Sequence, residues 1–103
     1  MKDEHRRKLV NSIMNDLNFI GVCDEYVERS LALLRIMDDI RFLKRDVDTF
    51  FRIRKGWDQP EDERKIIRVL NDIIDIDDRK IRVNASTEFA VLLLEIGYFS
   101  END

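Results

Sequence analysis

Residues 24–55 read DEYVERSLALLRIMDDIRFLKRDVDTFFRIRK and contain neither glycine nor proline. Apolar side chains recur along this stretch in alternating steps of three and four residues, at Leu33, Ile36, Ile40, Leu43, Val47 and Phe50. That spacing is typical of one face of an α-helix. The stretch therefore predicts one continuous helix, roughly 48 Å long at about 1.5 Å per residue. No other segment is long enough to cover this helix alone, so its partners decide the architecture.

The apolar face of this long helix shifts around the helix axis. In the first half, one side carries Tyr26, Val27, Leu34 and Met37. In the second half, the apolar face has rotated by about a quarter turn, to Ile40, Leu43, Val47, Phe50 and Phe51. We expect the first half to pack against the preceding helix and the second half against the helices that follow.

Three further helices are expected from apolar periodicity and from their flanking residues, at residues 3–20, 59–77 and 87–96. Gly21 is expected to end the first helix in a left-handed conformation, and Asp24 is expected to cap the long helix that follows. These assignments predict an all-α fold, a four-helix bundle-like domain over residues 1–103 with one long central helix (24–55) and up-down connectivity.

The C-terminal part of the chain is expected to hold a polar connector and a short apolar helix. In residues 79–86, Ile81 and Val83 alternate with charged residues, so this segment is predicted to lie outside the helices. Residues 87–96 are apolar on nearly all sides, apart from two glutamates. A helix of that composition is buried, so we expect it either at the centre of the bundle or between subunits.

Composition limits the class of protein. Hydrophobic residues make up 44% of the chain and charged residues 39%, which is typical of a soluble helical protein. No apolar run approaches the roughly 18–20 residues that span a bilayer, and the N-terminus lacks the apolar stretch of a signal peptide. The single cysteine, Cys23, excludes an internal disulfide. We therefore expect a cytoplasmic protein that does not contact membranes.

The residues that usually carry catalysis are scarce. His5 is the single histidine and lies among cations in the first turn, while Cys23 precedes an aspartate that disfavours its thiolate. One cysteine and one histidine cannot supply a zinc site, and the three glycines form no phosphate-binding motif. The sequence predicts no enzyme, no cofactor, no metal site and no small-molecule substrate.

The surface opposite the main apolar face offers a candidate partner-binding site. Leu31, Phe42 and Ile53 are spaced by eleven residues, which places them on one narrow ribbon of the long helix. Arg35 and Arg45 flank this ribbon, and aromatic residues and arginine are enriched at protein interfaces. Trp57, just beyond the helix, is an ambiguous further member, because it also suits capping of the helix end.

The leading hypothesis is a non-catalytic helical protein-binding module, such as a small regulator, inhibitor or assembly factor. The first and third helices are each roughly 26 Å long against 48 Å for the long helix. Part of the long helix is therefore expected to remain free for a protein partner or for a second copy of the chain, giving a homodimer.

Two alternatives belong to other classes. The first is a nucleic-acid-binding regulator. It would use a basic ridge on the long helix, formed by Arg41, Lys44, Arg45, Arg52 and Lys55. The same ridge also suits internal pairing with the acids at residues 61–63. The second alternative is a metal-dependent all-α nucleotide pyrophosphohydrolase, with Glu25, Glu28, Asp72 and Asp75 as its carboxylates. The net charge of −4 argues against the first alternative, and the polar-side position of the two aspartates argues against the second.

Overall fold

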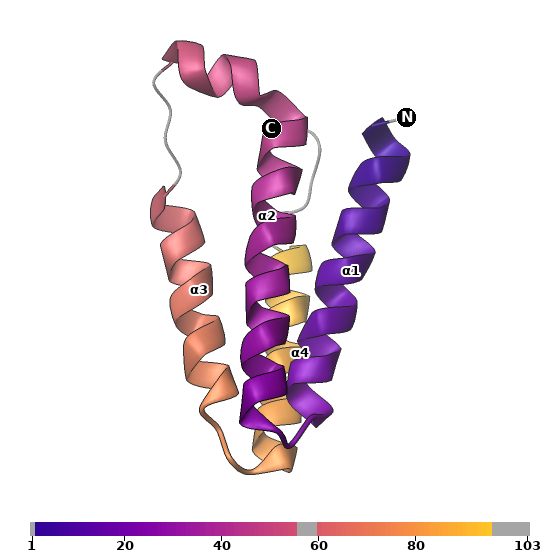
Figure 1. Cartoon of the computed structure of the whole chain (residues 1–103), viewed down its shortest axis with the longest axis vertical. Coiled ribbons are helices and arrows are strands. Elements are labelled where there is room, and N and C mark those ends of the chain that lie inside the picture. Colours follow the sequence, from indigo (N-terminus) through magenta and orange to yellow (C-terminus); the bar gives the residue numbers. More distant parts are fainter. Residues whose placement is uncertain (1, 56–59, 96–103) are drawn as a thin grey trace.

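The computed structural model describes the backbone of residues 2–55 and 60–95 and the side chains of residues 4–43 and 64–95. These residues contain no strand, which confirms the all-α prediction. They form four helices (Figure 1), α1 (Lys2–Val22), α2 (Tyr26–Lys55), α3 (Pro60–Ile74) and α4 (Arg79–Glu95). The molecule is elongated, with extents of 44 × 26 × 24 Å.

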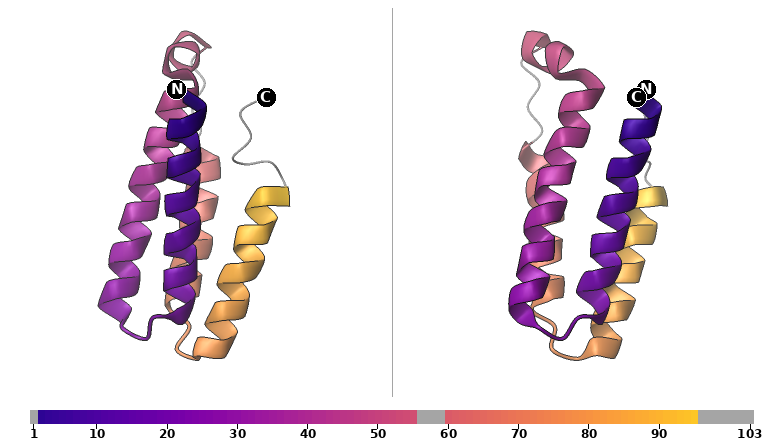
Figure 2. Two further views of the ribbon diagram at one scale, coloured as in Figure 1. Left: turned by 90° about the vertical axis from the view of Figure 1, so that its right-hand side faces the viewer. Right: turned by 45° about the vertical axis from the view of Figure 1, so that its right-hand side comes forward.

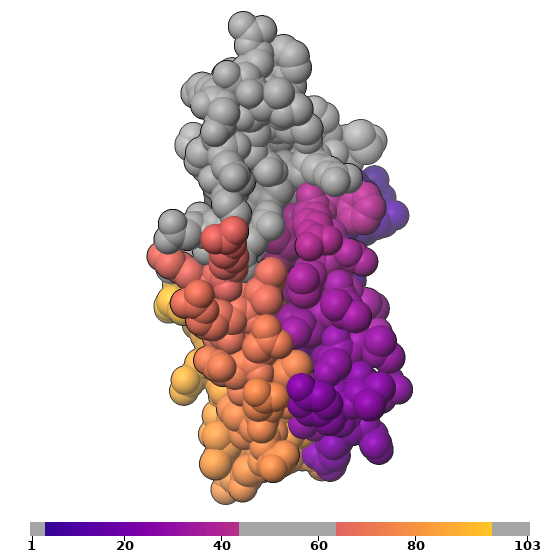
Figure 3. Space-filling model, turned by 60° about the vertical axis from the view of Figure 1, so that its left-hand side comes forward, coloured from indigo at the N-terminus to yellow at the C-terminus, as the bar shows by residue number. Residues whose placement is uncertain are grey.

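The four helices form a bundle in which α1 packs most extensively against α2 and α4. Figure 2 shows α1 beside α4 on one side and beside α2 on the other. Helix α3 packs against α2 (Figure 3) and, less extensively, against α4 and α1. Among the described residues the backbones of α2 and α4 are not neighbours, so these two helices lie at opposite corners of the bundle. The α1–α2 and α3–α4 loops meet at the same end (Figure 1).

The core lies between the inward faces of all four helices. Helix α2 contributes Leu33, Ile36, Ile40 and Leu43, each at most 6% exposed, as the spacing of the quoted stretch predicts. The other helices contribute Ile13, Leu17, Ile20, Ile66, Leu70, Ile73, Ile74, Phe89 and Leu93. The side chains of Val47, Phe50 and Phe51 lie outside the described residues.

Helix α2 is continuous through Met37 to Asp39 and extends to Lys55. It is not a straight rod, because Figure 1 shows its ribbon bending across the end of the bundle in its last turns. Helix α2 does pack against α1, but Tyr26, Val27 and Leu34 do not form this contact as expected, since all three are more than half exposed; Met37, the fourth expected residue, is partly buried against the core. The core face of α2 lies on the side of the helix opposite Val27 and Leu34.

Gly21 does not end α1, which continues to Val22. Its role is close packing instead, since a Cβ atom at this position would lie 2.6 Å from Oγ of Ser86 and 3.2 Å from Cα of Val83. The absence of a side chain allows the backbones of α1 and α4 to approach one another. The prediction of a left-handed stop is therefore corrected to a helix–helix contact.

The predicted connector at residues 79–86 is the first half of α4. Asp78 begins this helix, because its Oδ1 accepts a hydrogen bond from N of Ile81 at 3.1 Å, as an N-cap residue does. Arg82 is fully buried and lies on the core side of α4 with Ser86, Phe89 and Leu93, in steps of four, three and four. Because arginine is usually a surface residue, the helical spacing of these four positions is not evident from the sequence.

The C-terminal helix is neither short nor apolar throughout, and it does not lie at the centre of the bundle. Helix α4 has 17 residues, and its second half leaves Val91, Leu92 and Leu94 between 46% and 58% exposed. Central placement is therefore wrong for the single chain, while packing between subunits stays a prediction.

Candidate protein-binding surface

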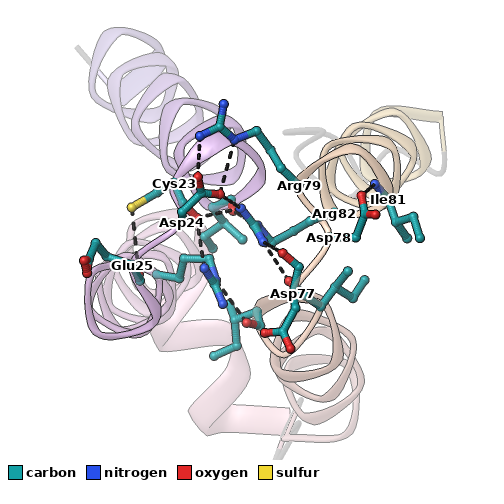
Figure 4. A network of polar contacts seen from close by, with 12 residues as sticks. Cys23, Asp24, Glu25, Asp77, Asp78, Arg79, Ile81 and Arg82 are labelled. Carbon is teal, nitrogen blue, oxygen red and sulfur yellow. Dashed lines mark hydrogen bonds and ion pairs between the residues drawn. The ribbon is translucent and has the colours of Figure 1, made fainter.

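Two buried arginines, Arg29 and Arg82, join the loops at one end of the bundle; Figure 4 labels Arg82 and its partners. Arg82 of α4 is 0% exposed and donates hydrogen bonds to four backbone carbonyl oxygens. The acceptors are Ile20 O at 2.9 Å, Cys23 O at 2.7 Å, Ile76 O at 2.7 Å and Asp77 O at 3.1 Å. These carbonyls lie at or just after the C-terminal ends of α1 and α3, where helical carbonyls lack an intrahelical partner.

Arg29 of α2 makes the second set of bonds at this end. It is 2% exposed and donates from Nε to Ile74 O and from Nη1 to Cys23 O, both at 3.0 Å. A guanidinium suits this place because the C-terminal ends of helices attract positive charge. Arg29 therefore fixes the first turns of α2 to the ends of α1 and α3.

Asp24 completes the network from the α1–α2 loop. Its carboxylate forms ion pairs with Arg79 and with Arg82, the latter at 2.9 Å. The hydrogen bond from Arg79, followed in size of effect by the one from Arg82, lowers the pKa of Asp24 to about 2. The pKa of Arg79 is raised by the same contact. Asp24 is therefore engaged with α4 and does not cap α2, whose first backbone bond runs from N of Arg29 to O of Glu25 at 3.0 Å.

Helix α2 also carries an apolar surface that faces away from the bundle, which we call the outer stripe. It consists of Val27, Leu31, Leu34 and Phe42, which are 68%, 44%, 54% and 55% exposed. At 100° per residue these four side chains fall within about 80° of arc on α2. They lie opposite the core face of the same helix. Helix α2 is thus apolar on two opposite faces, of which the bundle covers only one.

Charged side chains border the outer stripe. Glu28 and Arg35 lie two turns apart on its α1 side and are both exposed. Arg35 pairs with Asp16 of α1 at 3.1 Å, and its guanidinium lies 5.9 Å from the centre of the Phe19 ring. Asp38 interrupts the stripe and forms an exposed ion pair with Arg41 at 4.0 Å.

The structure places only some of the predicted partner-binding residues. Leu31 and Phe42 belong to the outer stripe, and Arg35 borders it. The remaining members of the two predicted surfaces have side chains outside the described residues, namely Lys44, Arg45, Arg52, Ile53, Lys55 and Trp57. Of the basic ridge, only Arg41 is described, and its pairing with Asp38 partly neutralises it.

Sequence reasoning missed Val27 and Leu34 as surface residues. Both were assigned to the core face, although they lie seven residues apart on the same side as Leu31. The signal was present in that spacing, because Val27, Leu31 and Leu34 follow steps of four and three. Two apolar faces on one helix make it difficult to tell from the sequence which face the core uses.

The carboxylates of the pyrophosphohydrolase alternative do not gather into a cation site. Within the described residues, no three histidine, cysteine, aspartate or glutamate side chains lie close enough together to hold a metal ion. Glu25, Glu28, Asp72 and Asp75 are all exposed at the surface.

Comparison with known proteins adds no relative. No family model, no curated protein and no solved structure matches the chain. None of the described helices has the length and hydropathy that crossing a bilayer requires. The fold and the outer stripe define a helical bundle with a candidate protein-binding face.

Proposed function

We propose that the chain is a non-catalytic helical protein-binding module, a small regulator, inhibitor or assembly factor, that acts through the outer stripe. One observation carries this proposal: four large apolar side chains on one face of α2 are between 44% and 68% exposed. Apolar residues gathered on one face mark an interaction site more often than apolar residues scattered singly.

The outer stripe holds enough apolar surface to support binding. Full burial of one such side chain stabilises by about 1.5–3 kcal/mol, so the exposed fractions of four represent roughly 3–7 kcal/mol. The bonds of Arg29 to Ile74 O and Cys23 O hold the first turns of α2 in place before a partner arrives. A surface that is already ordered loses less conformational entropy on binding.

In this function the chain acts as an up-down bundle with α2 as its long central helix, and it requires no cofactor or small-molecule substrate. We place it in the cytoplasm, where a half-exposed free thiol such as that of Cys23 stays reduced.

Affinity capture with matched variants tests this function. The full chain is immobilised and exposed to native extract and to purified soluble chain, alongside Leu34→Asp and a control variant, Glu88→Arg on α4. Leu34 is 54% exposed, so the aspartate places a charge on the outer stripe without entering the core. We expect captured proteins, the chain itself included, to be retained by the wild type and by Glu88→Arg and lost with Leu34→Asp.

Identical capture by all three proteins, or none by the wild type, contradicts the function. Binding of duplex DNA that weakens steeply with salt would instead favour the nucleic-acid alternative. Such DNA binding would depend on the basic ridge and would be unchanged in Leu34→Asp.

A further inference from the structure

We propose that the outer stripe binds a second copy of this chain, with the two α2 helices packed antiparallel about a twofold axis between Ala32 and Leu33. This inference rests on the proposed function and names its partner. When α2 is paired with a reversed copy of itself, the outer stripe is self-complementary in its central apolar contacts and in the charges along its α1 side.

The apolar contacts follow from the position of the axis. A residue numbered i then lies level with residue 65 − i of the second copy, so Leu31 meets the second copy's Leu34 on both sides of the axis. Phe42 lies level with residue 23 of the second copy, next to the C-terminal end of α1, where Val22 is 45% exposed. Val27 lies level with the second copy's Asp38, whose charge is balanced by Arg41 of its own chain.

The charges on the α1 side of the stripe complete the match. Glu28 and Arg35 lie on the same edge of α2, and the twofold axis keeps that edge beside the same edge of the second copy. Glu28 is then about 3 Å along the axis from the second copy's Arg35, at roughly 1.5 Å per residue. Two symmetric ion pairs result. Arg35 retains its bond to Asp16, because a guanidinium has five donors and its side chain is 53% exposed.

Other ways of pairing two copies are less favourable. A parallel pair of α2 helices places residues at the centre of the stripe beside their own copies, so Asp38 meets Asp38. Pairing through the exposed face of α4 brings Glu88 and Glu95 close to their own copies, with no cation among the exposed residues of that half of the helix. Like charges directly opposed are destabilising, so charge selects the antiparallel α2 pair.

One helix face is a small interface, below the area of stable obligate dimers. We therefore expect a weak dimer that forms in the high micromolar range. Its concentration dependence makes it accessible to sedimentation equilibrium.

The test is a charge exchange between two variants of the full chain. In Glu28→Arg and in Arg35→Glu, each homodimer has two pairs of like charges, so we expect its Kd to rise about tenfold or more. When the two variants are mixed, every Glu28–Arg35 contact again joins opposite charges. We expect a heterodimer with an affinity near that of the wild type.

A folding measurement and a surface variant on α4 serve as controls for this test. Circular dichroism melting checks that each variant is folded; should Arg35→Glu unfold beside Asp16, Glu28→Arg and Leu34→Asp decide the test alone. Glu88→Arg is expected to leave the dimer unchanged.

A dimer unaffected by Glu28→Arg or abolished by Glu88→Arg overturns the proposal. A wild-type chain that stays monomeric at high micromolar concentration also overturns it. In that last case, capture of a different protein that depends on Leu34 would still support the proposed function, so the two can fail separately.

Discussion

Arg29 and Arg82 lie near the starts of α2 and α4 on the core sides of their helices, where an apolar side chain is the usual occupant. Each guanidinium reaches past the apolar core to carbonyl oxygens at the helix ends. A buried cation is costly unless its donors are satisfied. Here the donors and the orphan carbonyls satisfy one another, which joins both loops.

Removing the Arg82 side chain is expected to destabilise the fold strongly. Arg82→Ala leaves four carbonyl oxygens and the Asp24 carboxylate without this donor, so we expect the free energy of unfolding to fall by about 3–5 kcal/mol. Arg82→Lys is expected to recover only part of the loss, because an ammonium group lacks the planar fork. Urea denaturation measures both, with the exposed neighbour variant Lys80→Ala as control. Equal stability of Arg82→Ala and Lys80→Ala would contradict this role.

The ion pairs of Asp24 predict a specific acid dependence. The folded pKa of about 2 lies below the ordinary value of 3.8, so Asp24 stabilises the folded state above pH 4. That contribution is lost as the pH falls from about 4 to about 2. We expect the unfolding midpoints of the wild type and Asp24→Asn to converge over this interval. A constant difference between them from pH 7 to pH 2 would rule out the ionised pair as its source.

Sequence patterns at the residue scale did not reveal the arginine network. Arg29 and Arg82 look like surface residues in a chain with 39% charged residues, and each has an acceptor far along the chain, Ile74 O at 45 positions and Ile20 O at 62 positions. The sequence does show that Arg29 lies one helical turn from Leu33 and Arg82 one turn from Ser86, on the core side of each helix. It does not show that these charges are buried, because their burial depends on carbonyl groups that only the folded loops bring together.

At the scale of helices, the contact between α1 and α4 depends on Gly21. An alanine in a helix ordinarily stabilises by about 1 kcal/mol relative to glycine. At Gly21 we expect the opposite sign, a loss of about 1 kcal/mol, because the added methyl group meets Ser86 and Val83.

A double-mutant cycle with Ser86→Ala checks the cause of this loss. Removing Oγ of Ser86 relieves the closest contact, so Gly21→Ala should cost less in the Ser86→Ala background. Thermal unfolding of the four proteins measures this difference. Stabilisation by Gly21→Ala in the wild-type background would contradict the close contact and make Gly21 an ordinary helical position.

The two faces of α2 predict different responses at adjacent residues. Leu33 is 6% exposed and Leu34 is 54% exposed. We expect Leu33→Ala to lower the free energy of unfolding by about 2–5 kcal/mol and Leu34→Ala by less than about 1 kcal/mol. Chemical denaturation at low protein concentration, where the chain is monomeric, compares them. Equal losses would place Leu34 in the core.

Helical periodicity predicted that four helices exist but not where all of them begin and end. It succeeded where apolar residues alone form the core face, as along Leu33, Ile36 and Ile40. It failed at residues 79–86, where a buried arginine and a serine hold core positions. It also failed at Gly21, because a helix stop and a close helix contact use the same residue.

In the whole molecule, the exposed apolar surfaces of α2 and α4 lie at opposite corners of the bundle. The α2 surface carries both acids and cations at its edge, whereas the charged residues among the exposed positions in the second half of α4 are acids only. The spacing of Leu31 and Phe42 correctly predicted that they share one face of α2. Their assignment to a surface that is free in the monomer required the fold, because either apolar face of α2 could have formed the core.

Sedimentation equilibrium of the wild type and Leu34→Asp tests most directly whether the outward face of α2 is an interface between two copies of the chain. We predict a wild-type mass that rises from monomer towards dimer with concentration, and a variant that stays monomeric while retaining the wild-type helical signal. A wild type that remains monomeric throughout, or a variant that dimerises equally well, would contradict an interface on this face of α2.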